Sequence, residues 1–303
     1  MYKILITDGL QDDAIKKLKQ EGFEVVCKYY EKGILGEKLK DFDGLVIRSA
    51  TKITRDILEA EKGGKLKLIV RAGVGIDNID INAAKEFNVT VKNTPNSSSD
   101  SVAELAIAHM FAVARFIGTS NYTMRNGEWN KKIYNGVEIA DKTLGIIGMG
   151  RIGRALGVKA KALGMNVIYN DSFGMQEDLE YEFVELKELL IKSDFVSLHI
   201  PYESEKGYII GKEELKKMKE GAYIINCARG RVVDEEALIE ALDSGKISGA
   251  GIDVFEIEPN TNERLVNHPR VSCTPHIGAS TVEAQDRIGK EVVSVIKDFF
   301  NWF

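Results

Sequence analysis

Cysteine is scarce in this chain of 303 residues, which holds only three, Cys27, Cys227 and Cys273, far apart in the sequence. No CxxC pair and no cluster of cysteine with histidine is present, so the sequence supports neither a disulfide framework nor a zinc site, and we expect no metal. No apolar run reaches the roughly 18 residues that a membrane-spanning helix needs. The first residues, MYKILITDGL, lack the basic segment and long apolar stretch of a secretory signal. We therefore expect a cytoplasmic protein without a membrane partner.

An excess of positive charge is also missing. Lys and Arg number 41 against 46 Asp and Glu, which gives a formal net charge of −5. A chain of this charge has no general attraction for nucleic acid or an anionic membrane surface, so neither is an expected partner. Hydrophobic residues at 44% and charged residues at 29% are ordinary for a globular protein. Because one average domain has about 100–200 residues, we expect two domains.

Short β-branched apolar segments alternate with amphipathic segments along most of the chain. The first series of predicted strands covers residues 3–8, 24–29, 44–49 and 66–73. After the polar stretch NTPNSSSD, a second series begins at residues 143–148 and 166–171 and continues through DFVSLHI, AYIINCA and GAGIDVF. Continuous apolar strands separated by helices are typical of a parallel sheet covered on both faces. The sequence therefore predicts two doubly wound α/β units.

Two predicted helices are longer than the others. Residues 101–117 are apolar on nearly every side, which predicts a helix buried between the two units. Residues 280–300 form a second long helical pattern.

A glycine-rich turn follows the first strand of the second series. Gly148, Gly150 and Gly153 match GxGxxG, with a predicted strand before them and a predicted helix after them. The first glycine permits the tight turn, the second lets the backbone approach a pyrophosphate, and the third lets the helix pack close to the strand. The free N–H groups of the helix then face the anion. This context favours a dinucleotide site over a simple turn.

An acidic residue stands at the end of the next predicted strand. Asp171 follows the glycine turn by about 20 residues, which is the place of the carboxylate that binds a ribose 2′-hydroxyl. A carboxylate there repels a 2′-phosphate, so we expect NAD and not NADP. The alternative interpretation makes Asp171 a turn residue at a strand end.

Three polar residues follow later predicted strands. Arg229 lies in INCARGRVVD, Glu258 in DVFEIEP and His276 in SCTPHIGAST. In an open α/β sheet, ligands bind beyond the carboxyl ends of the strands. Taken singly, each residue could be a cap, a solvated turn residue or an ion-pair partner.

The combination of GMGRIG, CARG, DVFEIEP and TPHIGAST resembles the D-isomer-specific 2-hydroxyacid dehydrogenases, over essentially the whole chain. Within that family it looks most like the short form of the phosphoglycerate dehydrogenase branch. The resemblance implies Rossmann and flavodoxin-like domains with a cleft between them. It places a substrate domain at residues 1–97 and 274–303, and an NAD-binding domain at residues 98–273.

The resemblance also implies a catalytic role for each of the three polar residues. His276 would exchange the proton of the C2 hydroxyl, because imidazole titrates near neutral pH. Glu258 would orient the imidazole and stabilise its charged form. Arg229 would bind the substrate carboxylate with its planar fork of donors.

Further contacts are carried over from the family by position. The predicted cofactor contacts, in addition to the three glycines and Asp171, are Arg151, Ile152, His199, Pro201, Cys227, Ala228, Asp253, Gly278 and Ala279. The predicted substrate contacts are Arg48, Ser49, Arg71, Gly73, Val74, Gly75 and Lys131. Arg48 would remain for a second anion, which favours 3-phosphoglycerate and a place in serine biosynthesis. Of the other histidines, His109 is expected to be packed inside its apolar helix.

Alternatives of two classes stay open. One is a glyoxylate or hydroxypyruvate reductase of the same family, and the other is an NADH-sensing protein without enzymatic activity. Formate dehydrogenase is disfavoured because Glu258 supplies a carboxylate that this branch lacks. A homodimer, or a tetramer built from dimers, is expected, with the helix at 101–117 as a candidate interface.

Overall fold

The computed structural model describes residues 1–260 and 262–300 and divides the chain into two compact units. Unit 1 contains Met1–Ser98 and the segment that starts at Ala279, and unit 2 contains Ser99–Gly278. The chain therefore leaves unit 1, forms all of unit 2, and returns. The predicted return at residue 274 differs from the observed one, because Asp253 of unit 2 accepts hydrogen bonds from the N–H groups of Ile277 and Gly278. His276 consequently belongs to unit 2.

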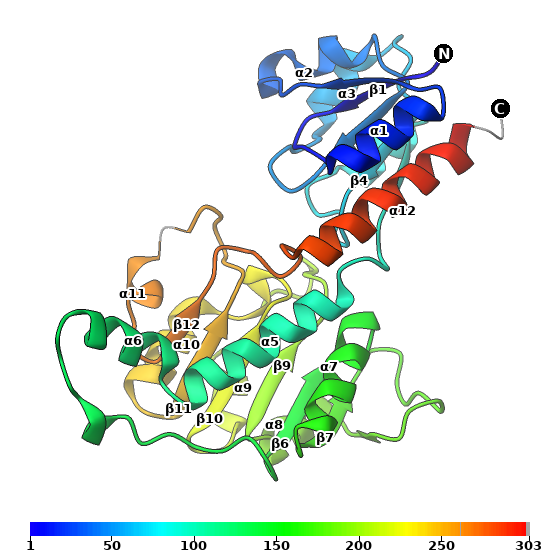
Figure 1. The fold of residues 1–303 in the computed structure, drawn as a ribbon. Helices are drawn as coiled ribbons and strands as arrows, with labels where there is room; N and C mark the ends of the chain where they lie inside the picture. The colour runs from blue at the N-terminus through cyan, green and yellow to red at the C-terminus, as the bar shows by residue number, and fades with distance from the viewer. Residues whose placement is uncertain (261, 301–303) are drawn as a thin grey trace. The chain divides into compact units, whose positions relative to one another are not determined.

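Unit 1 is built on a five-stranded parallel sheet with the strand order β2-β1-β3-β4-β5 (Figure 1). This is the flavodoxin-like order, in which the topological switch point lies between β1 and β3. The strands are β1 (Lys3–Ile6), β2 (Glu24–Cys27), β3 (Gly44–Ile47), β4 (Leu68–Arg71) and β5 (Thr90–Asn93). The helices are α1 (Asp12–Gln20), α2 (Lys32–Leu39), α3 (Arg55–Glu61), α4 (Ile81–Glu86) and α12 (Val282–Phe300).

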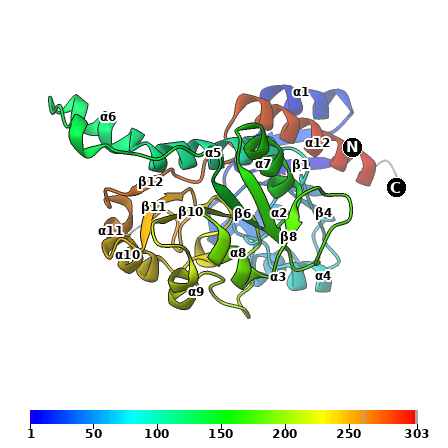
Figure 2. The ribbon, with the colours of Figure 1, turned by 90° about the horizontal axis from the view of Figure 1, so that it is seen from below.

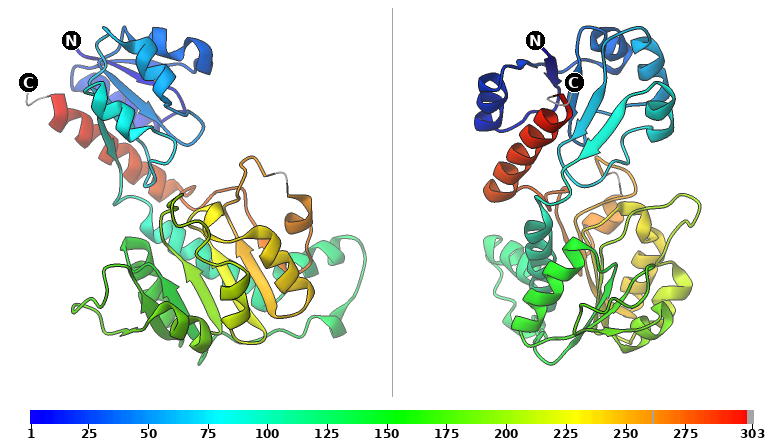
Figure 3. Two further views of the ribbon diagram at one scale, coloured as in Figure 1. Left: turned by 180° about the vertical axis from the view of Figure 1, so that it is seen from behind. Right: turned by 90° about the vertical axis from the view of Figure 1, so that its right-hand side faces the viewer.

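Helices cover both faces of this sheet, as the right-hand view of Figure 3 shows. Alternate residues of one strand point to opposite faces. Leu5 joins the apolar core beneath α2, α3 and α4, whereas Ile4 and Ile6 join the core beneath α1 and α12. The long final helix thus completes one face of a sheet whose strands all come from the first 93 residues.

Unit 2 contains a seven-stranded parallel sheet with the order β12-β11-β10-β9-β6-β7-β8. This is the Rossmann order, with an additional edge strand and a switch point between β6 and β9. The strands are β6 (Thr143–Ile147), β7 (Asn166–Asn170), β8 (Glu182–Phe183), β9 (Phe195–Leu198), β10 (Ala222–Asn226), β11 (Ile247–Ile252) and β12 (Val271–Cys273). The helices are α5 (Ser99–Ala114), α6 (Ile117–Arg125), α7 (Arg151–Ala162), α8 (Leu186–Lys192), α9 (Lys212–Lys217), α10 (Glu235–Asp243) and α11 (Glu263–Val266), with two short 3-10 turns at Lys131–Ile133 (η1) and Gly230–Val232 (η2).

The helix predicted at residues 101–117 is two helices. It breaks after Ala114, Phe116 takes the left-handed φ of 54°, and α6 leaves at an angle of 63°. The apolar residues of α5 pack on β10, β11, β12 and α7, so its burial is accounted for within unit 2. Within the described residues no single helix is long and apolar enough to cross a membrane, and only the bent pair of α5 and α6 meets that test by length and composition.

Candidate active site

The glycine-rich turn joins β6 to α7 at the switch point of unit 2. Gly148 has a left-handed φ of 95°, and a Cβ there would lie 2.5 Å from the carbonyl oxygen of His199. A Cβ on Gly153 would lie 2.2 Å from the carbonyl oxygen of Gly148. A Cβ on Gly150 would meet no atom within 4 Å, so the second glycine borders open space. These three environments fit a turn that closes tightly and leaves room beside its second glycine for a pyrophosphate.

The first turn of α7 is open to an anion. Gly150 is its N-cap residue and supplies no side-chain cap, while Arg151 begins the helix and Ile152 packs partly into the core. The N–H groups of this first turn have no partner inside the helix, and the helix dipole favours negative charge at this end. The groups of Arg151 and Ile152 that face a bound pyrophosphate would therefore be their backbone N–H groups.

Asp171 comes directly after β7 and is held against the glycine turn. One carboxylate oxygen accepts the Met149 N–H at 2.7 Å, and the other accepts the Phe173 N–H at 2.9 Å. The carboxylate is thus fixed at the end of the strand next to β6 and keeps lone pairs for two ribose hydroxyls. This arrangement fits NAD.

His199 lies across the switch point, after β9. Its Nε2 lies 2.9 Å from Ser197 Oγ, whereas its Nδ1 is buried and makes no hydrogen bond within the described residues. Burial lowers the pKa of His199 to about 4, so the ring is neutral at physiological pH. A buried polar atom without a hydrogen-bond partner at this position is consistent with a site for a polar ligand. Pro201, two residues further along the chain, is exposed.

Glu258 and His276 form a close pair. Glu258 Oε2 lies 2.8 Å from His276 Nδ1, and each side chain is a little more than one-third exposed. Partial burial works to raise the pKa of Glu258, but the hydrogen bond and charge of His276, the Phe255 N–H and the Arg229 guanidinium outweigh it and lower the pKa. Because Nδ1 is engaged, His276 Nε2 is the nitrogen left to exchange a proton with a bound molecule.

Arg229 is positioned by close packing of two loops. It follows β10, and its Nη1 donates to the Ala228 carbonyl oxygen at 2.6 Å. A Cβ on the next residue, Gly230, would lie 1.9 Å from the carbonyl carbon of Phe255, so the two chain segments are in direct backbone contact. The structure therefore brings Arg229, Glu258 and His276 together at the carboxyl ends of β10, β11 and β12.

The remaining predicted cofactor contacts lie in the same region of unit 2, with one exception. Cys227 and Ala228 are buried directly after β10, and burial, with the nearby Asp253, raises the pKa of the Cys227 thiol. Asp253 and Gly278 are buried and hydrogen-bonded to each other. Ala279 belongs to unit 1 and packs against its core.

The predicted substrate contacts of unit 1 gather at the carboxyl ends of β3 and β4, which are adjacent strands. Asp8, after β1, accepts the N–H groups of Arg48 and Thr51 at 2.7 and 2.9 Å. Asn78 donates to the carbonyl oxygens of the same two residues. Arg48 thus lies at the switch point of unit 1, with its backbone held on both sides and Ser49 exposed beside it.

The turn after β4 wraps around a guanidinium group. Gly73 has a φ of 151°, and a Cβ there would lie 1.5 Å from Arg71 Nη1. Only glycine leaves room for this arrangement, because the arginine side chain occupies the space of a Cβ. Val74 and Gly75 continue the turn, and the Val74 carbonyl oxygen accepts from Asn93 Nδ2.

Lys131 is not brought to the catalytic group. It is exposed in η1, and the following segment returns along the end of α5, where the Val137 N–H binds the Ala114 carbonyl oxygen. This end of α5 lies at the amino ends of the strands, since Val113 packs on Gly249 near the start of β11. Within one copy of the chain, Lys131 therefore lies at the end of the sheet opposite to Arg229, Glu258 and His276, and its predicted substrate contact finds no support there.

Sequence reasoning gave no role to Asp8, Asn78 and Thr274, which contact site residues, although Thr274 is the first residue of the TPHIGAST motif. Asp8 is the last residue of the predicted strand at 3–8, and Asn78 follows the predicted strand at 66–73 by five residues. Their partners lie 27–43 residues away in the sequence, so local spacing could not identify them.

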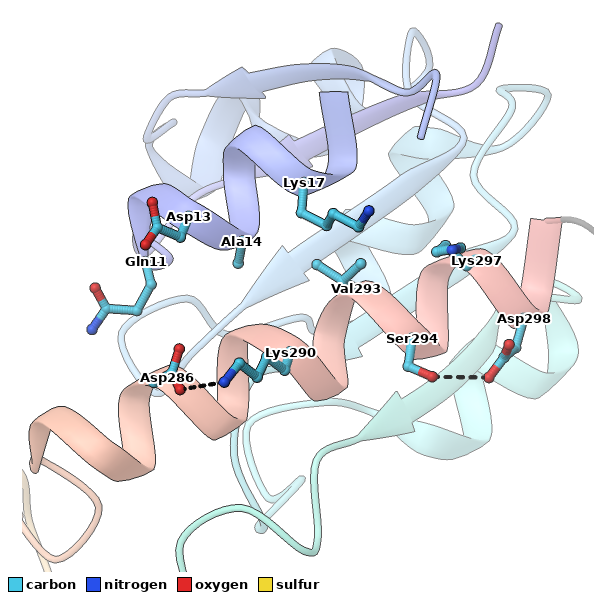
Figure 4. A pocket seen from close by; sticks show the side chains of 10 residues that line it. All are labelled: Gln11, Asp13, Ala14, Lys17, Asp286, Lys290, Val293, Ser294, Lys297 and Asp298. Atoms are coloured by element: carbon cyan, nitrogen blue, oxygen red, sulfur yellow. Dashed lines mark hydrogen bonds and ion pairs between the residues drawn. The ribbon is translucent and has the colours of Figure 1, made fainter. Parts of the chain in front are cut away.

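A hollow of about 460 Å³ lies between α1 and α12 of unit 1 (Figure 4). Its charged side chains are three lysines and three aspartates, and Lys290 is paired with Asp286 within it. None of its ten lining residues is a predicted cofactor or substrate contact. The hollow is thus separate from both sets of site residues.

Comparisons with known proteins agree with this arrangement. Residues 107–278 match the family model described as D-isomer specific 2-hydroxyacid dehydrogenase, NAD binding domain. Among solved structures, the chain is similar to D-lactate dehydrogenase from Aquifex aeolicus complexed with NAD and lactic acid, at 32% identity and a TM-score of 0.86, over 98% of this chain and 95% of that one.

Two curated relatives carry different names. The chain is 46% identical over 299 residues to the hydroxypyruvate reductase of Thermotoga maritima, and the match covers 97% of both chains. It is 48% identical over 301 residues to the D-3-phosphoglycerate dehydrogenase of Methanocaldococcus jannaschii, and this match covers 98% of this chain and 57% of that enzyme. The chain therefore spans little more than half the length of the second relative.

Proposed function

Since the chain belongs to the D-isomer-specific 2-hydroxyacid dehydrogenases, an NAD-binding family, we propose that it interconverts D-3-phosphoglycerate and 3-phosphohydroxypyruvate. The reaction is a reversible oxidation at C2 of a 2-hydroxy acid. NAD, when bound, supplies the hydride acceptor or donor. The protein supplies orientation, charge and proton transfer.

His276 is the proton carrier in this proposal. Glu258 holds Nδ1 at 2.8 Å and leaves Nε2 for the C2 oxygen. In the direction of oxidation Nε2 accepts the hydroxyl proton, and in the direction of reduction it returns one. The carboxylate of Glu258 stabilises the positive charge that the ring carries between these steps.

Arg229 binds the carboxylate that all 2-hydroxy acids share. Its planar fork of N–H groups matches the two oxygens of a carboxylate, and a fixed guanidinium restricts the orientation of C2. The backbone contact between Gly230 and Phe255 keeps this group in register with Glu258. The three side chains therefore account for the chemistry common to the family.

One observation supports a phosphorylated substrate. The Arg48 guanidinium, at the switch point of unit 1, makes no hydrogen bond or ion pair within the described residues, although its backbone is held by Asp8 and Asn78. A fixed backbone with an uncommitted cation is suited to a second anion in addition to the carboxylate. Phosphate at C3 provides that anion.

A substrate panel tests the proposal. With NADH in excess, kcat/KM is measured for 3-phosphohydroxypyruvate, hydroxypyruvate and glyoxylate in the native protein. We expect the phosphorylated acid to be preferred, and Arg48→Ala to reduce that preference by about 10- to 100-fold, since a hydrogen bond to a charged group contributes about 1.5–3 kcal/mol. Arg48→Lys should keep part of the preference. Lys52→Ala, an exposed cation in the same segment, is the matched control.

Equal preference in the native protein and Arg48→Ala would instead favour a hydroxypyruvate reductase, the name of the Thermotoga relative that covers 97% of both chains. Tight binding of NADH with no turnover of any 2-oxo acid would favour the NADH-sensing alternative. Each outcome therefore identifies one of the three candidates.

We also propose that the protein is a homodimer and that the contact involves α6 and η1. Figure 2 shows α6 extending beyond the edge strand of the sheet of unit 2. Ile117, Tyr122, Trp129 and Ile133 in this segment are 52–77% exposed, which is unusual for large apolar side chains in one short segment. A second copy of the same surface would bury them symmetrically. The expected cytoplasmic location stays a prediction.

A further inference from the structure

Unit 2 contains a buried histidine that the proposed reaction does not use. His109 on α5 is 2% exposed and packs against Gly251 of β11, where a Cβ would lie 2.5 Å from the Cβ of His109. Both ring nitrogens are engaged: Nδ1 lies 3.0 Å from Ser272 Oγ, and Nε2 lies 3.0 Å from Thr274 Oγ1. Both polar atoms of the buried ring are therefore satisfied, and one of the partners, Thr274, belongs to the loop that carries His276.

The proton on each group follows from the partners. Thr274 Oγ1 donates to Asp253 Oδ1 at 2.6 Å, and a hydroxyl has one proton to give. Thr274 must therefore accept from His109, so the Nε2 of His109 carries the hydrogen and Nδ1 accepts from Ser272. Burial lowers the pKa of His109, against the opposing charge of Asp253, and this keeps the ring neutral with a single N–H.

Asp253 carries this chain of hydrogen bonds into the loop that holds His276. Its carboxylate accepts the N–H groups of Ile277 and Gly278 at 2.8 and 2.9 Å, in addition to the hydroxyl of Thr274. Its main-chain oxygen accepts the His276 N–H at 2.8 Å. One aspartate therefore binds every residue from 274 to 278 except Pro275.

The loop at residues 274–278 contains a strained residue, so surrounding contacts are needed to hold its conformation. His276 has a φ of 53°, in the left-handed region that non-glycine residues rarely adopt. Such a conformation persists when surrounding interactions over-determine it. The Asp253 carboxylate provides those interactions, and its position depends on Thr274 and on the histidine behind it.

We propose that His109 is a positioning residue for His276: through Thr274 and Asp253 it holds the 274–278 loop in the one conformation that directs the imidazole at Glu258 and the substrate. This inference rests on the proton-transfer role of His276 and is independent of which 2-oxo acid is the substrate. It gives a function to a side chain that sequence reasoning treated as packing.

Three substitutions of His109 distinguish a role in positioning His276 from a role in filling the core. Gln places an N–H where Nε2 stands and keeps the donor to Thr274. Asn places its amide where Nδ1 stands and loses that donor, and Leu loses both partners. Val113→Ala is the matched control, because Val113 is buried on the same helix against the same strand and has no part in the hydrogen-bonded chain.

We expect His109→Leu and His109→Asn to lower kcat by about 10- to 100-fold, the range caused by a misplacement of about 1 Å. A larger deuterium isotope effect from labelled NADH should show that the chemical step has become slower. His109→Gln should retain most of the native kcat. Val113→Ala should lower the melting temperature without changing the isotope effect.

A readout without substrate or cofactor completes the test. In the free protein, hydrogen exchange at the Ile277 and Gly278 amides should accelerate in the Leu and Asn variants and stay slow in the Gln and Val113→Ala proteins. The proposal is overturned if the Leu variant behaves like Val113→Ala in exchange and in kcat, or if Gln is as impaired as Leu. If the native protein turned over no 2-oxo acid, the proposed function would fail, while the exchange data would still decide whether His109 holds the loop.

Discussion

At the scale of single residues, the site depends on polar groups whose charge state the fold controls. His199 is kept neutral by burial, which lowers its pKa from 6.5 to about 4. Glu258 is kept ionised by His276 and by neighbouring donors, against the effect of its partial burial. Both shifts act in the same direction: each group takes up a proton only at a lower pH than usual, which leaves His199 neutral and Glu258 charged.

His199 predicts a loss of stability in mild acid. Its folded pKa lies below the unfolded value, so the unfolded chain binds more protons and stability falls as the pH decreases from 6.5 towards 4. Between pH 7 and pH 5 we expect His199 to cost about 2 kcal/mol, at about 1.36 kcal/mol for each pKa unit. Urea unfolding at the two pH values measures it. His199→Gln should show a smaller decrease, and since His109 remains in both proteins, its own contribution cancels; an equal decrease would contradict the prediction.

We expect substitution of Gly73 to weaken substrate binding without affecting cofactor binding. Replacing it with Ala puts a methyl group into the space of the Arg71 guanidinium, so Arg71 must move. We expect the KM for the 2-oxo acid to rise by about tenfold or more, as for the loss of one charge-assisted hydrogen bond, with the Kd for NADH unchanged. Gly9→Ala is the control, because Gly9 has a φ of 80° but a Cβ there meets no atom within 4 Å. Similar KM values in the two variants would show that backbone strain, and not Arg71, matters.

How much of the site could be read from the sequence depended on distance along the chain. The glycine turn and Asp171 were predictable because a strand, a turn and a helix adjoin one another in the sequence. The pair of Glu258 and His276 was predictable from family motifs. The hydrogen bond from His109 to Thr274 was not, because 165 residues separate them and only the packing of α5 on β11 brings them together. Burial of His109 was expected; its partners were not.

At the scale of whole elements, strand alternation and helix periodicity predicted the cores well, and the ends of elements less well. The predicted helix at 101–117 continues in a straight line on the basis of its apolar residues, yet Phe116 turns into the left-handed region without a glycine or proline to mark the break. The boundary between the units lies after residue 278 and not at the predicted residue 274, because Ile277 and Gly278 donate hydrogen bonds to Asp253 of unit 2. No local sequence signal marks these contacts.

The contact between α1 and α12 supplies a test at this scale. A Cβ on Gly289 of α12 would lie 2.9 Å from the Cβ of Ala14 on α1, so a larger residue must push the helices apart. We expect Gly289→Val to destabilise unit 1 by about 1–3 kcal/mol, the usual cost of overpacking. Gly33→Val in α2, where a Cβ meets nothing within 4 Å, should change stability by less than about 0.5 kcal/mol.

Hydrogen exchange of the β1 amides, together with urea unfolding, compares the two variants. The core beneath α1 and α12 includes Ile4 and Ile6, so loosening of this helix pair should be visible in that strand. Equal stability of Gly289→Val and Gly33→Val would show that the helices can separate at no cost, which the close packing argues against.

At the scale of the whole molecule, the exposed apolar segment predicts assembly. Ile117→Asp combined with Ile133→Asp should convert the proposed homodimer into a monomer of 33.6 kDa, because two charges would be buried at the proposed contact. Val158→Asp is the matched control, since Val158 is 65% exposed on α7 of the same unit. Sedimentation velocity distinguishes the species. A native protein that sediments as a monomer would reject the proposal directly.

The return of the chain to unit 1 has a consequence for biosynthesis. While the ribosome is still adding the final helix, unit 2 already has all of its residues, whereas the sheet made from the first 93 residues lacks the cover that α12 gives to Val46, Leu68 and Val70. The sheet of unit 1 can therefore be completed only after α12, which is translated after all of unit 2. Residues 1–93 are in this sense completed after the unit that follows them in the chain.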